Sequence, residues 1–167
     1  MLGVAASLFA ATGSAAADTP PENQAFYLTF LHSRKCVSVP NDTAADVQLT
    51  QWTCLGKTSQ RYTWLRLSDD ADWGLLRNVA TGKCVAVAGG SAVSGAAIVQ
   101  TTCAATNRAQ WFTTPTDRLV PETWYWLVNA GSGKAVAVPG ATTANGAQLI
   151  QYDRQLTPNE YVKWTPA

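Results

Sequence analysis

The stretch Thr81-Gly82-Lys83-Cys84-Val85-Ala86-Val87 decides the architecture of this chain, because it occurs three times in similar form. The other two copies read Ser33-Arg34-Lys35-Cys36-Val37-Ser38-Val39 and Ser132-Gly133-Lys134-Ala135-Val136-Ala137-Val138. In each copy a polar turn is followed by a lysine and a short alternating strand. The fourth residue of the copies recurs after 48 and then 51 residues. A period of this length indicates a repeat architecture, in which several units bury a core that no single unit buries alone.

The sequence around these copies has the same order of elements in each repeat. Short segments rich in Val, Thr, Tyr, Phe and Trp alternate with Gly, Asn, Asp and Ser turns, which is typical of strands. No apolar stripe with helical period follows the N-terminal segment. We therefore predict an all-β fold of three four-stranded repeats, closed about a pseudo-threefold axis that hides the strand edges. The repeats are expected at about residues 25–68, 73–116 and 124–167, with Trp64, Trp111 and Trp164 in the core.

The four cysteines all fall in the first two repeats. Four cysteines allow three pairings, and the repeat selects the one in which each bridge joins the second strand to the third within one unit. The predicted bridges are Cys36–Cys54 and Cys84–Cys103. A zinc site is the disfavoured alternative, because no Cys-x-x-Cys spacing is present. We predict no metal and no cofactor, and we expect the third repeat, which has no cysteine, to be the loosest.

Length and composition limit the class of protein. A chain of 167 residues with 47% apolar residues is sufficient for one domain with a real core. The net charge is +1, and charged residues make up only 14% of the chain without forming a basic stripe. These values argue against nucleic acid as a partner.

The N-terminal residues have the pattern of an export signal. Residues 1–17 contain an apolar run followed by small residues, so we predict a signal peptide there, although the run has no preceding Lys or Arg. A buried N-terminal helix is the alternative. The run is too short to span a membrane. Residues 18–24 are expected to form a flexible tether, and the mature protein to be secreted and extracellular, which agrees with paired cysteines.

These features resemble the ricin B-type lectins, a carbohydrate-binding family with the β-trefoil fold. The resemblance rests on the Gly-Lys-Cys-Val-x-Val phrase, the cysteine 18 or 19 residues later, and a tryptophan in a Gln- or Asn-containing segment at the end of each repeat. It extends over about residues 25–167. The resemblance implies a secreted, non-catalytic module that binds galactose- or xylan-type glycans weakly through one or two shallow sites.

The resemblance also implies where the sugar would bind. In that family each repeat supplies an Asp two residues after the first cysteine and an aromatic platform two residues before the second. Here the Asp positions hold Ser38, Ala86 and Ala137, and the platform positions hold Trp52, Thr101 and Tyr152. The second repeat is therefore expected to be inactive. The candidate ligand-binding residues are Ser38, Asn41, Asp42, Trp52 and Arg61 in the first repeat, and Asn145, Tyr152 and Asn159 in the third.

The sequence also bears on two other classes of function. Loss of the aspartates favours a protein-interaction trefoil, such as an inhibitor or toxin companion that no longer binds sugar and has a protein as its partner. An enzyme is disfavoured, because His32 is the only histidine and lies beside a predicted turn. The sequence also contains no nucleophile elbow and no phosphate loop.

Overall fold

The computed structural model describes residues 19–43, 46–67, 72–115 and 124–167. The expected signal peptide, residues 1–17, lies outside the described residues. Within the described ranges, no helix is long and apolar enough to cross a membrane. Part of the expected tether contacts the domain, since Pro20 is buried and the Asn23 amide donates to the Trp64 carbonyl at 3.3 Å.

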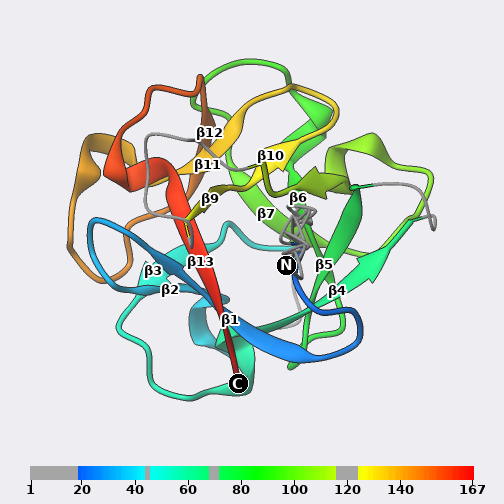
Figure 1. Ribbon diagram of the computed structural model, residues 1–167, viewed down its shortest axis with the longest axis horizontal. Coiled ribbons are helices and arrows are strands. Elements are labelled where there is room, and N and C mark those ends of the chain that lie inside the picture. Colours follow the sequence, from blue (N-terminus) through cyan, green and yellow to red (C-terminus); the bar gives the residue numbers. More distant parts are fainter. Residues whose placement is uncertain (1–18, 44–45, 68–71, 116–123) are drawn as a thin grey trace, which may run out of the picture.

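All extended segments of the described ranges belong to one antiparallel sheet of thirteen strands, so the predicted all-β class is confirmed. Figure 1 shows the strands arranged as units round a common centre. The first repeat contains β1 (Ala25–Phe30), β2 (Cys36–Ser38), β3 (Thr50–Trp52) and β4 (Arg61–Arg66), and the second contains β5 (Gly74–Asn78), β6 (Cys84–Val87), β7 (Ile98–Thr101) and β8 (Phe112–Thr113). The third contains β9 (Tyr125–Trp126), β10 (Val128–Asn129), β11 (Ala135–Ala137), β12 (Ile150–Tyr152) and β13 (Tyr161–Pro166).

The outer strands of the repeats close into a barrel. β1 pairs with β4 and β13, β4 pairs with β5, and β5 pairs with β8. The ring is completed by β8 with β10 and by β9 with β13. The hairpins β2–β3, β6–β7 and β11–β12 stand beside the ring and contact each other through isolated bridges, one of which joins Ala97 to Ile150. This is the arrangement of a β-trefoil.

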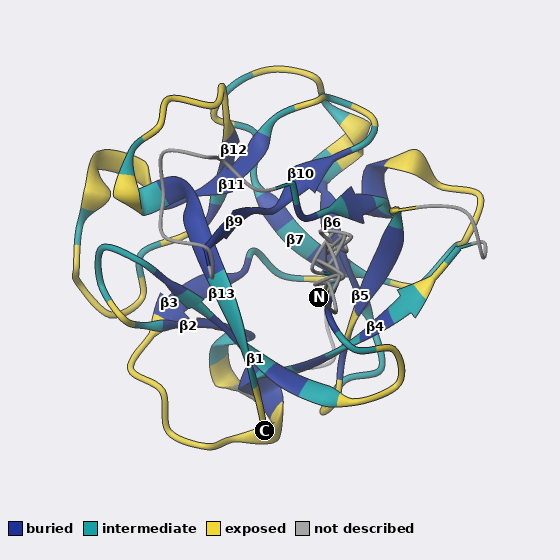
Figure 2. Ribbon diagram, in the orientation of Figure 1, coloured by how far each residue is buried: buried dark blue, intermediate teal, exposed yellow. Residues whose placement is uncertain are grey.

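Three equivalent residues mark the pseudo-threefold axis. Leu49, Ile98 and Leu149 are each fully buried. Their backbones form a closed triangle: the amide of each donates to the carbonyl of the next, at 2.8, 3.0 and 2.8 Å. Valines from the second strand of every repeat pack around them in one core cluster. Figure 2 shows the inner strands buried and the outer loops exposed.

Each repeat also carries a short 3-10 helix after its second strand and another before its last strand. The first set is η1 (Pro40–Asp42), η3 (Ala88–Gly90) and η5 (Pro139–Ala141), and the second set is η2 (Thr58–Gln60), η4 (Arg108–Gln110) and η6 (Pro158–Glu160). Because these helices recur at the same place, the loops that they shape are equivalent in the three repeats. The second set directly precedes the last strands or, in the second repeat, lies one residue before that strand.

The alignment of the terminal tryptophans predicted from the sequence is wrong in the second repeat. Trp64 is fully buried, as expected. Trp111 directly follows the last residue of η4 and thus occupies the position of Arg61, which directly follows η2. It is half-buried, and its indole Nε1 donates to the Ala105 carbonyl at 2.8 Å. The neighbouring Phe112, which is fully buried, occupies the position of Tyr62, and the buried Thr114 occupies that of Trp64.

Both predicted disulfides are confirmed. Cys36 is bonded to Cys54 and Cys84 to Cys103, and each bridge lies within one repeat. Each bridge joins the start of the second strand to the loop after the third, which fixes the ends of these hairpins.

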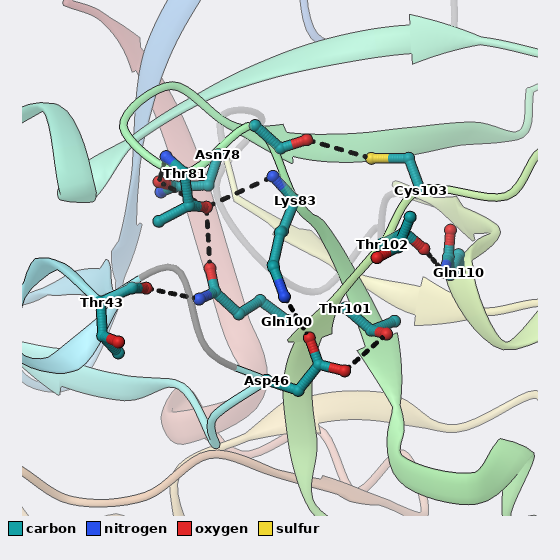
Figure 3. A network of polar contacts seen from close by, with 11 residues as sticks. Thr43, Asp46, Asn78, Thr81, Lys83, Gln100, Thr101, Thr102, Cys103 and Gln110 are labelled. Carbon is teal, nitrogen blue, oxygen red and sulfur yellow. Dashed lines mark hydrogen bonds and ion pairs between the residues drawn. The ribbon is translucent and has the colours of Figure 1, made fainter.

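Buried glutamines connect neighbouring repeats where the hairpins meet. Gln100 accepts a hydrogen bond from Thr81 Oγ1 of its own repeat at 2.9 Å and donates to the Thr43 carbonyl of the first repeat at 2.7 Å (Figure 3). Gln51 and Gln151 make the equivalent contacts in the first and third repeats. The three glutamines are at most 1% exposed. They hold the loops of one repeat against the hairpin of the next.

Candidate functional site

A shallow hollow lies at the same place in every repeat. Each is enclosed by the second and third strands and by the two 3-10 helices of its repeat. The hollows measure about 270, 480 and 340 Å³ in the first, second and third repeats. The pseudo-threefold symmetry therefore offers three candidate sites, which differ in their lining side chains.

The floor of the first hollow carries two hydroxyl groups. Ser38 on β2 and Thr50 on β3 are directly opposite in the strand register, and each is only 7% exposed. Thr50 Oγ1 has no hydrogen-bond partner among the described residues. Among the described residues, Ser38 Oγ makes only a long contact of 3.5 Å with the Val39 carbonyl. A buried hydroxyl without a partner costs about 1–3 kcal/mol, so this floor is suited to a ligand that supplies polar atoms.

The floors of the other two hollows are apolar at the same positions. The pair opposite in register is Ala86 with Val99 in the second repeat and Ala137 with Ile150 in the third. These side chains offer no hydrogen bond to a ligand. The first hollow is thus chemically distinct from its two equivalents.

An aromatic side chain forms one wall of the first hollow. Trp52 ends β3 and is 42% exposed, a large exposed fraction for a tryptophan. A Cβ added to Gly146 of the third repeat would lie 3.5 Å from Trp52 Cζ3, so the third repeat supports the indole on one side. The face of an indole offers apolar area and negative potential to the C–H groups of a sugar ring. The third hollow has Tyr152 at this place, 38% exposed, and the second has Thr101.

The rim of the first hollow is polar. Asn41 lies in η1 with φ +55°, where the equivalent residues are Gly89 and Gly140 with φ +60° and +61°. Asparagine tolerates this left-handed conformation better than most residues, so the first repeat gains an exposed amide there. Lys57, which precedes η2, is also exposed and lines this hollow.

The loop between Trp52 and η2 is held by a buried side chain. Gln60 Nε2 donates to the Thr53 carbonyl at 2.9 Å, and its Oε1 accepts from the Leu55 amide at 2.7 Å. Gln110 makes the same two bonds in the second repeat. In the third repeat the residue is Glu160, which is 1% exposed and accepts from the Gln155 amide at 2.7 Å. Burial raises the pKa of the Glu160 carboxyl, against the lowering effect of that hydrogen bond.

The structure brings some of the expected residues together and separates others. Ser38, Asn41 and Trp52 line the first hollow, and Tyr152 and Asn159 line the third. Asn159 Nδ2 donates to the Val138 carbonyl at 2.8 Å, so it also fixes a wall.

Two expected residues lie outside the predicted sets, and the prediction for a third, Asp42, stays open. Arg61 is not among the lining residues; its guanidinium donates to the Tyr27 hydroxyl and the Gly56 carbonyl, both at 2.9 Å. Asn145 belongs to the third repeat but contacts the first, where its Oδ1 accepts from the Thr53 amide at 3.0 Å. The Asp42 backbone ends η1, and its side chain lies outside the described part of the chain.

The second hollow receives a carboxylate from another repeat. Asp46 of the first repeat lines it and accepts hydrogen bonds from Lys83 and from Thr101 Oγ1, the latter at 3.1 Å (Figure 3). The hydrogen bond from Lys83 holds the pKa of Asp46 below its ordinary value. Both oxygens are thus already occupied by protein groups.

Thr50 and Lys57 also line the first hollow, and neither was predicted from the sequence. Thr50 had a usable signal, since it is the only hydroxyl among its three equivalents, Val99 and Ile150 being the others. Lys57 had none, because the loop that carries it is placed by contacts that its local sequence does not show, among them the bonds of Gln60 and of Arg61.

Comparison with known proteins supports the same architecture. The sequence profile of the family described as ricin-type beta-trefoil lectin domain-like matches residues 68–152. No curated protein sequence matches the chain significantly. A designed threefold-symmetric protein, ThreeFoil, is 26% identical with a TM-score of 0.80, over 86% of this chain and 99% of that one.

Two natural lectins have the same fold. The Rhizoctonia solani agglutinin is 16% identical with a TM-score of 0.76, over 91% of this chain and 100% of its own. A ricin B-like lectin from Macrolepiota procera, solved with lactose, is 11% identical with a TM-score of 0.76, over 89% of this chain and 99% of its own. The profile match spans half of the chain, and the threefold barrel agrees with it. The chain therefore belongs to the ricin-type β-trefoil lectin domain-like family.

Proposed function

We propose that the protein is a secreted, non-catalytic carbohydrate-binding module that holds its glycan mainly in the hollow of the first repeat. The observation that carries this proposal is the pair of buried hydroxyls, Ser38 and Thr50, beneath the exposed indole of Trp52. Galactose- or xylan-type glycans are the expected ligands. Family membership supports carbohydrate as the ligand class, and the two disulfides support an oxidising compartment.

The physical fit lies in the amphipathic character of a sugar. One face of a pyranose ring presents C–H groups, which pack on an aromatic surface, while its edge presents hydroxyls that both donate and accept. Trp52 offers the surface, and Ser38 and Thr50 offer hydroxyls that can serve as donor or acceptor. A shallow site of this kind binds weakly, with a Kd near the millimolar range or about 4 kcal/mol. Tyr152 gives the third hollow a similar wall without the polar floor, so we expect it to be a weaker second site.

Affinity electrophoresis in gels containing xylan or galactan tests this proposal. The wild-type protein is expected to be retarded by at least one polysaccharide. Trp52→Ala should reduce the affinity tenfold or more, and the double variant Ser38→Ala/Thr50→Val, which copies the second hollow, should reduce it about fivefold or more for each hydrogen bond lost. Thr101→Ala, at the platform position of the second hollow, is the matched control and should leave the affinity within twofold.

The outcomes separate the candidate functions. If no polysaccharide retards the folded wild-type protein, carbohydrate binding is wrong and a protein-interaction trefoil becomes the better explanation. If Trp52→Ala and the double variant bind as well as wild type, the glycan site lies elsewhere on the domain.

A further inference from the structure

We propose that Asn145 of the third repeat is a positioning residue for the first hollow, and that it orients the indole of Trp52 without touching the ligand. This inference rests on the proposed function, because it concerns the wall on which a glycan would pack. It follows from the hydrogen bonds that join the hairpin carrying Trp52 to a turn of the third repeat.

Trp52 lies at the exposed end of a strand. It is the last residue of β3 and is 42% exposed, so much of its indole faces solvent. A Cβ added to Gly146 would lie 3.5 Å from Trp52 Cζ3, so this edge of the ring packs against the third repeat. An exposed side chain that is free to turn must be immobilised when a ligand packs on it, and this lowers affinity. The orientation of the indole therefore depends on where the turn at Asn145 and Gly146 is held.

Asn145 fixes this turn to the residue that follows Trp52. Its Oδ1 accepts hydrogen bonds from the Thr53 amide at 3.0 Å and from Thr53 Oγ1 at 3.1 Å. The same oxygen accepts from Lys35 Nζ, which also donates to Thr53 Oγ1 at 3.3 Å. One side-chain oxygen of the third repeat thus gathers three donors of the first repeat beside Trp52.

The residue that precedes Trp52 is bound to the same segment through its backbone. The Gly146 amide donates to the Gln51 carbonyl, and the Gln51 amide donates to the Ala147 carbonyl, both at 2.9 Å. Trp52 is therefore flanked on both sides by residues that bond to the third repeat. Because these backbone bonds do not involve the side chain of Asn145, replacing that side chain tests its role while the segment stays attached.

The junction between the first and second repeats has a similar contact without an aromatic wall. Asp46 accepts from Lys83, the equivalent of Lys35, and from Thr101 Oγ1 (Figure 3). Thr101 has the strand register of Trp52, since each lies opposite the first cysteine of its repeat. Asp46→Ala should thus remove a comparable contact between repeats while leaving Trp52 in place, which makes it the matched control.

Affinity electrophoresis in gels containing xylan or galactan measures the effect on binding, and circular dichroism checks that each variant is folded. Asn145→Ala should weaken the affinity roughly three- to tenfold, whereas Asp46→Ala should leave it within twofold. Asn145→Asp keeps the acceptor oxygens and should bind within twofold of wild type. In a Trp52→Ala background, Asn145→Ala should change the affinity less than twofold, because its effect passes through the indole.

A spectroscopic measurement follows the indole directly. The Nε1–H signal of Trp52 in a ¹H–¹⁵N NMR spectrum is identified by its absence from Trp52→Ala. Asn145→Ala should shift this signal and lower its order parameter, because the ring gains freedom. Asp46→Ala should leave the signal unchanged.

The outcomes separate the positioning role from the proposed function. The positioning role is wrong if Asn145→Ala binds as wild type does, if Asp46→Ala weakens binding equally, or if the indole signal is unchanged. It is also wrong if Asn145→Ala lowers the affinity by the same factor without Trp52, since Asn145 would then contact the ligand itself. If neither polysaccharide binds the folded wild type, the proposed function is wrong, and the indole signal alone decides whether Asn145 orients Trp52.

Discussion

Replacement of Glu160 by glutamine is expected to stabilise the protein. In the first two repeats the equivalent Gln60 and Gln110 each donate to a backbone carbonyl and accept from a backbone amide in the loop after the third strand. Glu160 keeps the accepted bond, from Gln155 at 2.7 Å. Its ionised carboxylate has no proton to donate to a carbonyl. Glu160→Gln would supply the missing donor in the one repeat without a disulfide.

The stabilisation expected from Glu160→Gln increases with pH. Burial raises the pKa of Glu160 above its ordinary value of 4.5, and the charge of Asp153 adds to this rise. At pH values between 4.5 and the raised pKa, the Glu160 carboxyl has released its proton in the unfolded state and has kept it in the folded state. The free energy of unfolding of the wild type therefore falls as pH rises through this interval, and it stays lowered above it. Below about pH 4 the group is protonated in both states and the effect vanishes.

At pH 7 the restored hydrogen bond and the removal of a buried carboxylate should together raise the free energy of unfolding by about 1–2 kcal/mol. This corresponds to an increase in Tm of roughly 3–8 °C for a domain of this size. The advantage should shrink toward zero near pH 4, because a protonated carboxyl can donate as an amide does.

Thermal and urea unfolding followed by circular dichroism at pH 4, 5.5 and 7 measures the effect. Gln60→Glu, the reciprocal change in the first repeat, is the matched variant and should lose stability at pH 7 and recover it at pH 4. The reasoning is refuted if Glu160→Gln is no more stable than wild type at pH 7, or if its advantage is the same at all three pH values.

Three further predictions concern the scaffold. Gly74→Ala should lose at least about 2 kcal/mol in urea unfolding, because the added Cβ would lie 2.2 Å from the buried Trp64 ring; an unchanged midpoint would contradict this contact. Gln100→Leu should cost about 2–3 kcal/mol by the same measurement, since it breaks the bonds to Thr81 and Thr43. Replacing both cysteines of the Cys84–Cys103 bridge by alanine should cost about 3 kcal/mol, and a Tm equal to that of wild type would rule out a stabilising role.

Local sequence signals were reliable where the relevant contacts lie within one repeat. The recurring phrase placed the hairpins, and the cysteine spacing gave both bridges. Ser38 and Trp52 could be placed in one hollow because β2 and β3 pair with each other in a short hairpin. Trp111 was misplaced, because the last strand of the second repeat pairs with β5 and β10 through Phe112 and Thr113, which leaves Trp111 just before the strand.

The sequence by itself determined the threefold repeat, the all-β class and the disulfides, because each depends on spacing along the chain. Only the tertiary structure decided which side chains share a hollow. Asn145 of the third repeat contacts the first repeat, and Asp46 of the first repeat contacts the second. Arg61 bonds to Tyr27 and does not line the first hollow. The physical reason is that the barrel closes through contacts between repeats. Residues about 50 to 110 positions apart, such as Gln100 and Thr43 or Lys35 and Asn145, become neighbours only when that closure is complete.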